Sequence, residues 1–248
     1  MSTAAARPTT AQATPLRQDA AVIGLVGLAH ASSHFSHLLL PLMFPVFMKV
    51  FGLSYSELGL LMSIFFVVSG VGQALAGFLV DRLGARPVLF GALSLLAMGC
   101  LWAARAQGYA DLMVVAVFLG LGNCSFHPVD FTILNQRVSV PRLGYAFSAH
   151  GLTGNLGWAV APLFMVGLSE WWDWRVAYHC AAGLFLAILA LALWQRSALS
   201  TQVHRASPGA AQQVSALAFM KVPVVWWCFA FFMLSTMTLA IVQTFGVS

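Results

Sequence analysis

Residues 56–87 read SELGLLMSIFFVVSGVGQALAGFLVDRLGARP, and this stretch decides the fold. From Leu58 to Val80 it contains no charged residue, and it then turns abruptly polar. An α-helix needs about 20 mostly apolar residues to cross the hydrocarbon core of a bilayer. Residues 56–80 therefore predict a membrane-spanning helix, and the charged residues that follow predict a loop at the membrane surface.

Similar apolar runs recur along the chain, at residues 20–48, 87–105, 111–134, 144–168, 175–195 and 222–246. Hydrophobic residues make up 60% of the 248 and charged residues only 8%, whereas a soluble domain carries roughly 25% charged residues. Such a chain lacks the polar groups that a water-exposed surface needs, and it does not need them where lipid surrounds it. We therefore predict an all-α membrane protein with six closely spaced helices in residues 20–195 and a seventh helix in residues 222–246.

Two polar segments flank these helices. Residues 1–19 are rich in Ala, Thr and Pro and lack the apolar core of a signal peptide, so we predict a disordered cytoplasmic tail. Residues 196–221 are polar and mildly basic, and we predict a cytoplasmic linker there. Because the seventh run has no partner helix after it, we expect the chain to be the first half, plus one helix, of a longer protein.

The basic residues indicate how the helices are oriented. If the N-terminus lies in the cytoplasm, only Lys49, Arg105 and Arg175 fall outside. The other basic residues then lie inside, namely Arg7, Arg17, Arg82, Arg86, Arg137, Arg142, Arg196, Arg205 and Lys221. Cytoplasmic loops carry an excess of Lys and Arg, so we predict a multi-pass protein of the inner (plasma) membrane of the cell with a cytoplasmic N-terminus.

Several other classes of function find no support in the sequence. The net charge of +5 follows from this loop bias, and no basic patch predicts a nucleic-acid partner. The four cysteines lie within apolar runs and form no CxxC pair, so we expect buried thiols rather than disulfides or zinc ligands. A phosphate-binding Gly-rich loop with a Lys is absent, and we expect no cofactor and no enzymatic activity.

The charged loop after residue 80 has a distinctive pattern. It reads Gly77-Phe-Leu-Val-Asp81-Arg82-Leu-Gly84-Ala-Arg86 and resembles the G-x-x-x-D-R-x-G-x-R signature of the major facilitator superfamily. We expect Gly77 to allow a close helix crossing, Asp81 to end its helix, and Gly84 to permit a tight turn. The resemblance implies the N-terminal six-helix bundle of a major facilitator fold plus the seventh helix, with this loop as a cytoplasmic gate motif.

A narrower resemblance covers residues 120–162. The segments GLGNCSFHPVD (120–130) and GYAFSAHGLTGNLGWAVAP (144–162) are similar to the fourth and fifth helices of the fosmidomycin-resistance branch of that superfamily. This resemblance implies a secondary active transporter that exports a small organic or drug-like substrate by proton-coupled antiport and alternating access. Proton-coupled uptake of a small metabolite on the same fold remains an alternative.

Polar side chains within the predicted helices mark a candidate pathway, because such groups are costly in lipid. His30, His34 and His37 recur at helical spacing in the first helix, and Asn123, His127 and Asp130 share one face of the fourth. The resemblance implies that these two helices line a central cavity. The candidate proton and substrate pathway residues are His30, His34, His37, Asn123, His127, Asp130, His150 and Asn155.

Asp130 is the only acid that we place within a predicted span. We interpret it as a protonation site, and we expect His34 to contact the pathway directly. Two simpler interpretations stay open, a static salt bridge from Asp130 to Arg137 and histidines that only form hydrogen bonds between helices. Three histidines on one face also permit a metal site, but no spaced acids or cysteines complete it, so we predict no metal.

The fifth predicted helix carries a row of small residues. Gly151, Gly154, Gly157 and Ala161 are spaced by three and four residues, which predicts one stripe for close packing and sliding of helices. Ordinary tight packing explains the same pattern. Pro162 follows the stripe and predicts a bend, because proline interrupts the backbone hydrogen bonds of a helix.

A seven-helix receptor or sensor is an alternative from a different functional class. Such receptors place the N-terminus outside the cell, and the charge bias predicts the opposite orientation. The partners that we expect are the lipid bilayer, a small-molecule substrate, protons, and either a missing C-terminal half or a second copy of the chain.

Overall fold

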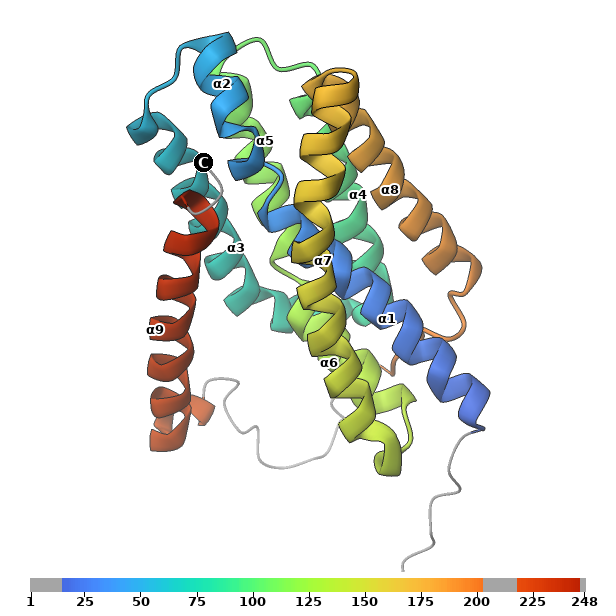
Figure 1. Cartoon of the computed structure of the whole chain (residues 1–248). Coiled ribbons are helices and arrows are strands. Elements are labelled where there is room, and N and C mark those ends of the chain that lie inside the picture. The colour runs from blue at the N-terminus through green and yellow to red at the C-terminus, as the bar shows by residue number, and fades with distance from the viewer. Residues whose placement is uncertain (1–14, 203–217, 246–248) are drawn as a thin grey trace, which may run out of the picture.

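The computed structural model describes residues 15–202 and 218–245, and within these ranges it contains helices and no strand (Figure 1). The α-helices are α1 (Leu16–His37), α2 (Phe44–Phe51), α3 (Tyr55–Leu83), α4 (Ala85–Ala103), α5 (Tyr109–Asn123), α6 (Phe126–Arg137), α7 (Leu143–Trp171), α8 (Trp174–Trp194) and α9 (Pro223–Phe245). Short 3-10 helices occur at η1 (Pro41–Met43), η2 (Val140–Arg142) and η3 (Ala218–Lys221).

Six stretches among the described residues are long and apolar enough to cross a membrane, namely Leu16–Phe51, Tyr55–Leu83, Ala85–Ala103, Tyr109–Arg137, Val140–Trp171 and Trp174–Trp194. The apolar helix α9 follows them. The predicted all-α membrane fold is therefore confirmed. The linker between α8 and α9 is described only as far as residue 202 and again from 218, so most of residues 196–221 lies outside the described ranges.

The first apolar run begins earlier and is less regular than expected. Of the predicted disordered tail, residues 1–14 lie outside the described ranges, whereas α1 already begins at Leu16. The run is also not one helix, because α1 ends at His37 and α2 begins at Phe44. Pro41 and Pro45 lie at the starts of η1 and α2, where the missing N–H of proline does least harm.

The fourth apolar run is interrupted as well, between α5 and α6 at Cys124 and Ser125. The reason is Pro128, which has no N–H to donate to the carbonyl of Cys124 and whose ring clashes with that carbonyl. The ladder resumes one residue later, where the Val129 N–H donates to the Ser125 carbonyl at 3.0 Å. This break lies immediately before His127 and Asp130, so it sets the direction in which both side chains leave the helix.

The loop between α3 and α4 turns as its sequence predicts. Gly84 adopts a φ of 85°, which only glycine reaches without strain, and α4 begins at the next residue. Gly77 differs from its expected role, since no described atom lies within 4 Å of the place where its Cβ would be. It therefore makes no close helix crossing within the described part of the chain.

Helices α1 and α7 cross in close contact near the centre of the bundle (Figure 1). A Cβ at Gly157 would run into the carbonyl oxygen of Ala31, and a Cβ at Gly154 would lie 2.7 Å from the His34 ring. Gly154, Gly157 and Ala161 are buried, but Gly151 is exposed and faces open space. The small-residue stripe therefore begins at Gly154, and α7 continues without interruption through Pro162.

The cysteines do not share one environment. Cys100 is buried in α4, whereas Cys180 and Cys228 are exposed on the outer surfaces of α8 and α9. The expectation of buried thiols is wrong for these two residues, because a helix in lipid needs no polar outer face and its apolar side chains point outward as well as inward.

Candidate functional site

Asp130 lies on α6 at the centre of a buried polar cluster, and its side chain has no exposed surface. One oxygen, Oδ2, accepts from two imidazoles: Nδ1 of His30 on α1 and Nε2 of His150 on α7, each at 3.1 Å. The carboxylate therefore joins three helices. Arg137 does not reach it, since its Nε donates to the Ala198 carbonyl at 3.2 Å, and the expected salt bridge between Asp130 and Arg137 does not form.

The second oxygen of this carboxylate, Oδ1, is buried and has no hydrogen-bond partner within the described ranges. A buried carboxylate is costly unless it is paired, and it often takes up a proton instead. The described partners of Asp130 are both imidazoles, so no guanidinium or ammonium group lies beside this carboxylate within the described ranges.

The histidines of α1 extend from this cluster along one face of the helix. The ring centroids are 4.4 Å apart for His30 and His34 and 5.4 Å apart for His34 and His37. His127 on α6 lies across from them, with its ring centroid 5.2 Å from that of His30. The structure thus brings together all five of the histidines that the sequence singled out, from three different helices.

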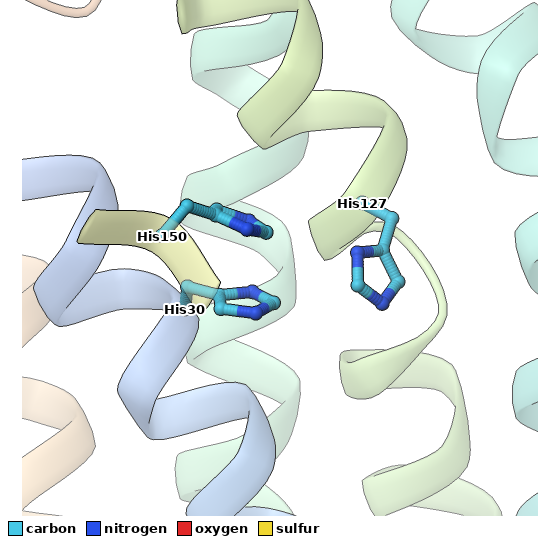
Figure 2. A group of neighbouring side chains, drawn as sticks. All are labelled: His30, His127 and His150. Carbon is cyan, nitrogen blue, oxygen red and sulfur yellow. The ribbon is translucent and has the colours of Figure 1, made fainter. Parts of the chain in front are cut away.

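Figure 2 shows His30, His127 and His150, whose ring nitrogens lie within 4.8 Å of one another. A metal ion must lie in the plane of each imidazole that binds it, about 2.0 Å from the nitrogen. The rings of His30 and His150 are stacked, with centroids 3.5 Å apart and planes 23° apart, and one nitrogen of each ring already bonds Oδ2 of Asp130. In the described structure these two histidines therefore serve as hydrogen-bond partners of the carboxylate.

Asn123, at the end of α5, anchors a second polar group nearby. Its Nδ2 donates to the hydroxyl of Ser33 at 2.8 Å and to that of Ser36 at 3.3 Å, both on α1. Its Oδ1 accepts from Ser69 on α3 at 2.8 Å. Sequence reasoning missed these serines, although Ser33 and Ser36 lie three residues apart in α1. The side-chain amide of Asn123 thus has hydrogen-bond partners for both its oxygen and its nitrogen, and these bonds hold α1, α3 and α5 together.

A cavity of about 500 Å³ lies beside this cluster, between α9 and the six-helix bundle. The six-helix bundle contributes the polar residues His37, Ser69, Gln73, Asn123 and His127, and α9 contributes Thr236 and apolar side chains such as Phe229 and Phe232. Gln73 is a further residue that sequence reasoning missed.

Five predicted pathway residues are not part of this lining, namely His30, His34, Asp130, His150 and Asn155. Of these, His30, Asp130 and His150 form the neighbouring hydrogen-bonded cluster. Asn155 is exposed on α7. His34 packs against Trp158 of α7 with ring centroids 4.2 Å apart, so His37 and His127 face the cavity where His34 was expected. A larger groove of about 630 Å³ runs along α3 and α4, but its lining is mainly apolar, with Arg82 as its one ionised side chain among the described residues. We therefore place the candidate site at the smaller cavity.

The gate motif lies at the same end of the bundle as the first residues of the linker. Asp81 and Arg82 are exposed. Arg86 donates to the carbonyl of Arg196 at 3.2 Å, and the Ala85 N–H donates to the hydroxyl of Thr201 at 3.0 Å. The turn at Gly84 and the start of the linker are thus held together, a contact that the motif alone does not predict.

Asp19 is a second buried acid, on the first turn of α1. The sequence places it in a disordered tail, but in the structure its side chain has no exposed surface. Its Oδ2 pairs with Arg142 at 2.6 Å and also accepts from the Ser139 hydroxyl. The expectation that Asp130 is the only acid within a span is therefore wrong.

Comparison with known proteins agrees with this architecture. Residues 26–248 match the family "Major Facilitator Superfamily". The chain is 26% identical over 189 residues to the uncharacterized MFS-type transporter YfnC of Bacillus subtilis and 26% identical over 200 residues to the fosmidomycin resistance protein of Escherichia coli. These matches cover 74% and 80% of the chain but 46% and 48% of the relatives, so the chain spans about half of their length.

A crystal structure of a peptide transporter in complex with sulfate has the same fold. It superposes with a TM-score of 0.65 at 22% identity, over 90% of this chain and 46% of the other. Both resemblances stated from the sequence are thereby confirmed, and the alternatives of a receptor and of an enzyme fall away. This chain, a multi-pass membrane protein, belongs to the Major Facilitator Superfamily.

Proposed function

We propose that this chain supplies the substrate-facing half of a proton-coupled secondary transporter that exports a small organic or drug-like molecule by alternating access. The single observation that carries the proposal is the hydrogen bonding of the buried Asp130 to His30 and His150, beside a cavity lined by His37 and His127. When Asp130 is ionised, it attracts both imidazoles, and protonation of the carboxylate weakens that attraction. Proton binding thereby loosens the contact among α1, α6 and α7.

The shape and lining of the cavity suit a small amphipathic substrate. Polar side chains lie on the side of α1, α3 and α6, and aromatic and Met side chains lie on α9. Ligand sites commonly combine an apolar wall with a few polar groups that orient the ligand. His37, Gln73 and His127 are the side chains that we expect to contact the substrate.

The names of two relatives favour export over uptake. They are the fosmidomycin resistance protein of Escherichia coli and a multidrug resistance protein B homolog of Mycobacterium tuberculosis, 25% identical over 201 residues. Uptake remains the second candidate because a probable L-galactonate transporter of Escherichia coli is 24% identical over 139 residues. The direction in which whole cells accumulate the substrate separates the two.

Alternating access needs a second six-helix unit, since substrate must be exposed to each side of the membrane in turn. The relatives are about twice as long as the matched region, so we propose that this unit is either a further part of the same protein or a second copy of the chain. We also propose location in the inner (plasma) membrane with the N-terminus in the cytoplasm, in keeping with the distribution of basic residues.

Inverted membrane vesicles that contain the chain together with its second six-helix unit test the proposal. The vesicles are acidified inside by respiration, a fluorescent dye reports the pH difference, and fosmidomycin is added as the probe. We expect proton release from vesicles with the unmodified chain and none with Asp130→Asn. Asp111→Asn is the control, because Asp111 is only partly buried, lies outside the cluster and bonds Trp102 and Gln107 in the described structure. Equal release with Asp130→Asn would remove Asp130 from the mechanism, and no release with the unmodified chain would contradict antiport of this probe.

A further inference from the structure

The histidines of α1 form a continuous file from the cavity to the buried carboxylate. His37 lines the cavity, and His34 and His30 follow at ring-centroid distances of 5.4 Å and 4.4 Å. The file ends at Asp130, to which Nδ1 of His30 is bonded at 3.1 Å. Nδ1 of His34 and Nδ1 of His37 are buried and have no hydrogen-bond partner within the described ranges, so both atoms are available for exchange of a proton.

Gly154 on α7 lies directly against this file. A Cβ at this position would lie 2.9 Å from Nδ1 of His34 and 3.0 Å from Nε2 of His30. The missing side chain therefore lets α7 approach the two nitrogens that a proton passing from His34 to His30 must use. The atoms that approach Gly154 belong to the imidazoles and not to the backbone, so a side chain at this position would displace the rings themselves.

We infer that His37, His34 and His30 form a proton path between the cavity and Asp130, and that Gly154 is the positioning residue that lets the rings of His34 and His30 lie in this arrangement. This inference rests on the proposed function and names the route by which its coupling proton travels. One proton from the cavity binds His37, and each imidazole takes a proton on one nitrogen as it releases one from the other. His30 passes its Nδ1 proton to Oδ2 of Asp130, so that one proton is added to the carboxylate and each ring ends neutral.

The other ionisable groups that face the file lie on α6 and α7. His127 stands 5.2 Å from His30 between ring centroids, and His150 is stacked on His30 at 3.5 Å. His150 bonds Asp130 at the end of the path, whereas His127 lines the same cavity as His37 and offers a parallel entry to His30. Trp158 of α7 packs against His34 and His37 without offering a group that titrates.

The test measures how fast Asp130 gains a proton, not whether substrate moves. The purified chain in lipid nanodiscs receives a rapid drop in pH, and time-resolved infrared spectroscopy follows the carbonyl band of the protonated carboxyl. The band is assigned to Asp130 by its absence in Asp130→Asn. The variants are Gly154→Ala, which displaces the rings of His34 and His30 without removing an ionisable group, and His34→Phe, which keeps the ring but cannot carry a proton. Gly151→Ala is the matched control, because Gly151 lies one turn away and faces open space.

We expect protonation to slow by about tenfold or more in Gly154→Ala and in His34→Phe, while the final amplitude of the band stays the same and Gly151→Ala matches the unmodified chain. Should Gly154→Ala fail to fold, His34→Phe alone decides the outcome. Unchanged rates in the variants overturn the proton path and leave the proposed function intact. A band that does not change with pH in the unmodified chain overturns both, because Asp130 then takes up no proton.

Discussion

Two buried aspartates, Asp19 and Asp130, lie in the same bundle with no exposed surface, yet their partners differ. Asp19 is paired with the guanidinium of Arg142 and accepts from Ser139 with both of its oxygens. Asp130 has only imidazoles as described partners, both on one oxygen. Arginine stays protonated under all ordinary conditions, whereas histidine changes charge near neutral pH.

The contrast teaches that burial alone does not make an aspartate functional. Asp19 is paired with the permanent cation of Arg142, and this ion pair links α1 to the start of α7. Asp130 has imidazoles as its described partners, and the proposed function gives it the coupling proton. The chemistry of the partner is therefore what distinguishes the two buried carboxylates.

The largest expected effect is the loss of the permanent cation. Arg142→Ala leaves Asp19 buried beside Ser139, and removing one partner of a buried ion pair costs about 3 kcal/mol or more. Unfolding by SDS titration in mixed micelles measures this loss. Arg137→Ala is the control, with an expected loss of about 1 kcal/mol or less, because it removes one exposed hydrogen bond to Ala198. Equal losses of unfolding free energy in the two variants would show that the ion pair of Asp19 and Arg142 stabilises the fold no more than an exposed hydrogen bond does.

A smaller loss of stability is expected from disturbing the close packing of α1 on α7, which joins the regions of Asp19 and Asp130. Gly157→Ala places a methyl group against the Ala31 carbonyl and forces the helices apart, at a cost of about 1–3 kcal/mol. The same titration measures it. Gly151→Ala, in open space on the same helix, should be neutral or stabilising by up to about 1 kcal/mol. If both substitutions behave alike, the close crossing of α1 and α7 is not a determinant of stability.

The smallest expected effect on stability comes from Asp130→Asn. An asparagine oxygen still accepts a hydrogen bond from one imidazole, and no unpaired charge is left behind, so the free energy of unfolding should change by about 1 kcal/mol or less. This small change, together with the loss of proton coupling expected above, separates Asp130 from Asp19. A loss of stability as large as that of Arg142→Ala would instead show that Asp130, like Asp19, mainly stabilises the packing of the helices.

Much of the fold follows from residues read in order. The long apolar runs predict six spans and the seventh helix, and the Gly84 turn follows from the motif around it, as its φ of 85° confirms. The interruptions near Pro41 and Pro128 escaped prediction. Hydropathy averages over a run and does not register a single missing N–H, although the prolines themselves were visible in the sequence.

The site was only partly predictable. Helical spacing correctly grouped His30 with His34 and His37, since these three follow one another along one face of α1. The pairing of Asp130 with His150 instead of Arg137 was not predictable, and neither was the burial of Asp19. Each depends on which helices are neighbours and on the distance between them.

The sequence by itself determined that this chain lies in a membrane as a helical bundle of the Major Facilitator Superfamily, because apolar length and a local loop motif are properties of contiguous residues. Only the tertiary structure decided which acid pairs with arginine and which with imidazoles, where the cavity lies, and that Gly154 lies directly against two histidines. The physical reason is that the free energy of a buried charge depends on atoms within a few ångströms of it. In a bundle, those atoms come from helices far apart in the chain.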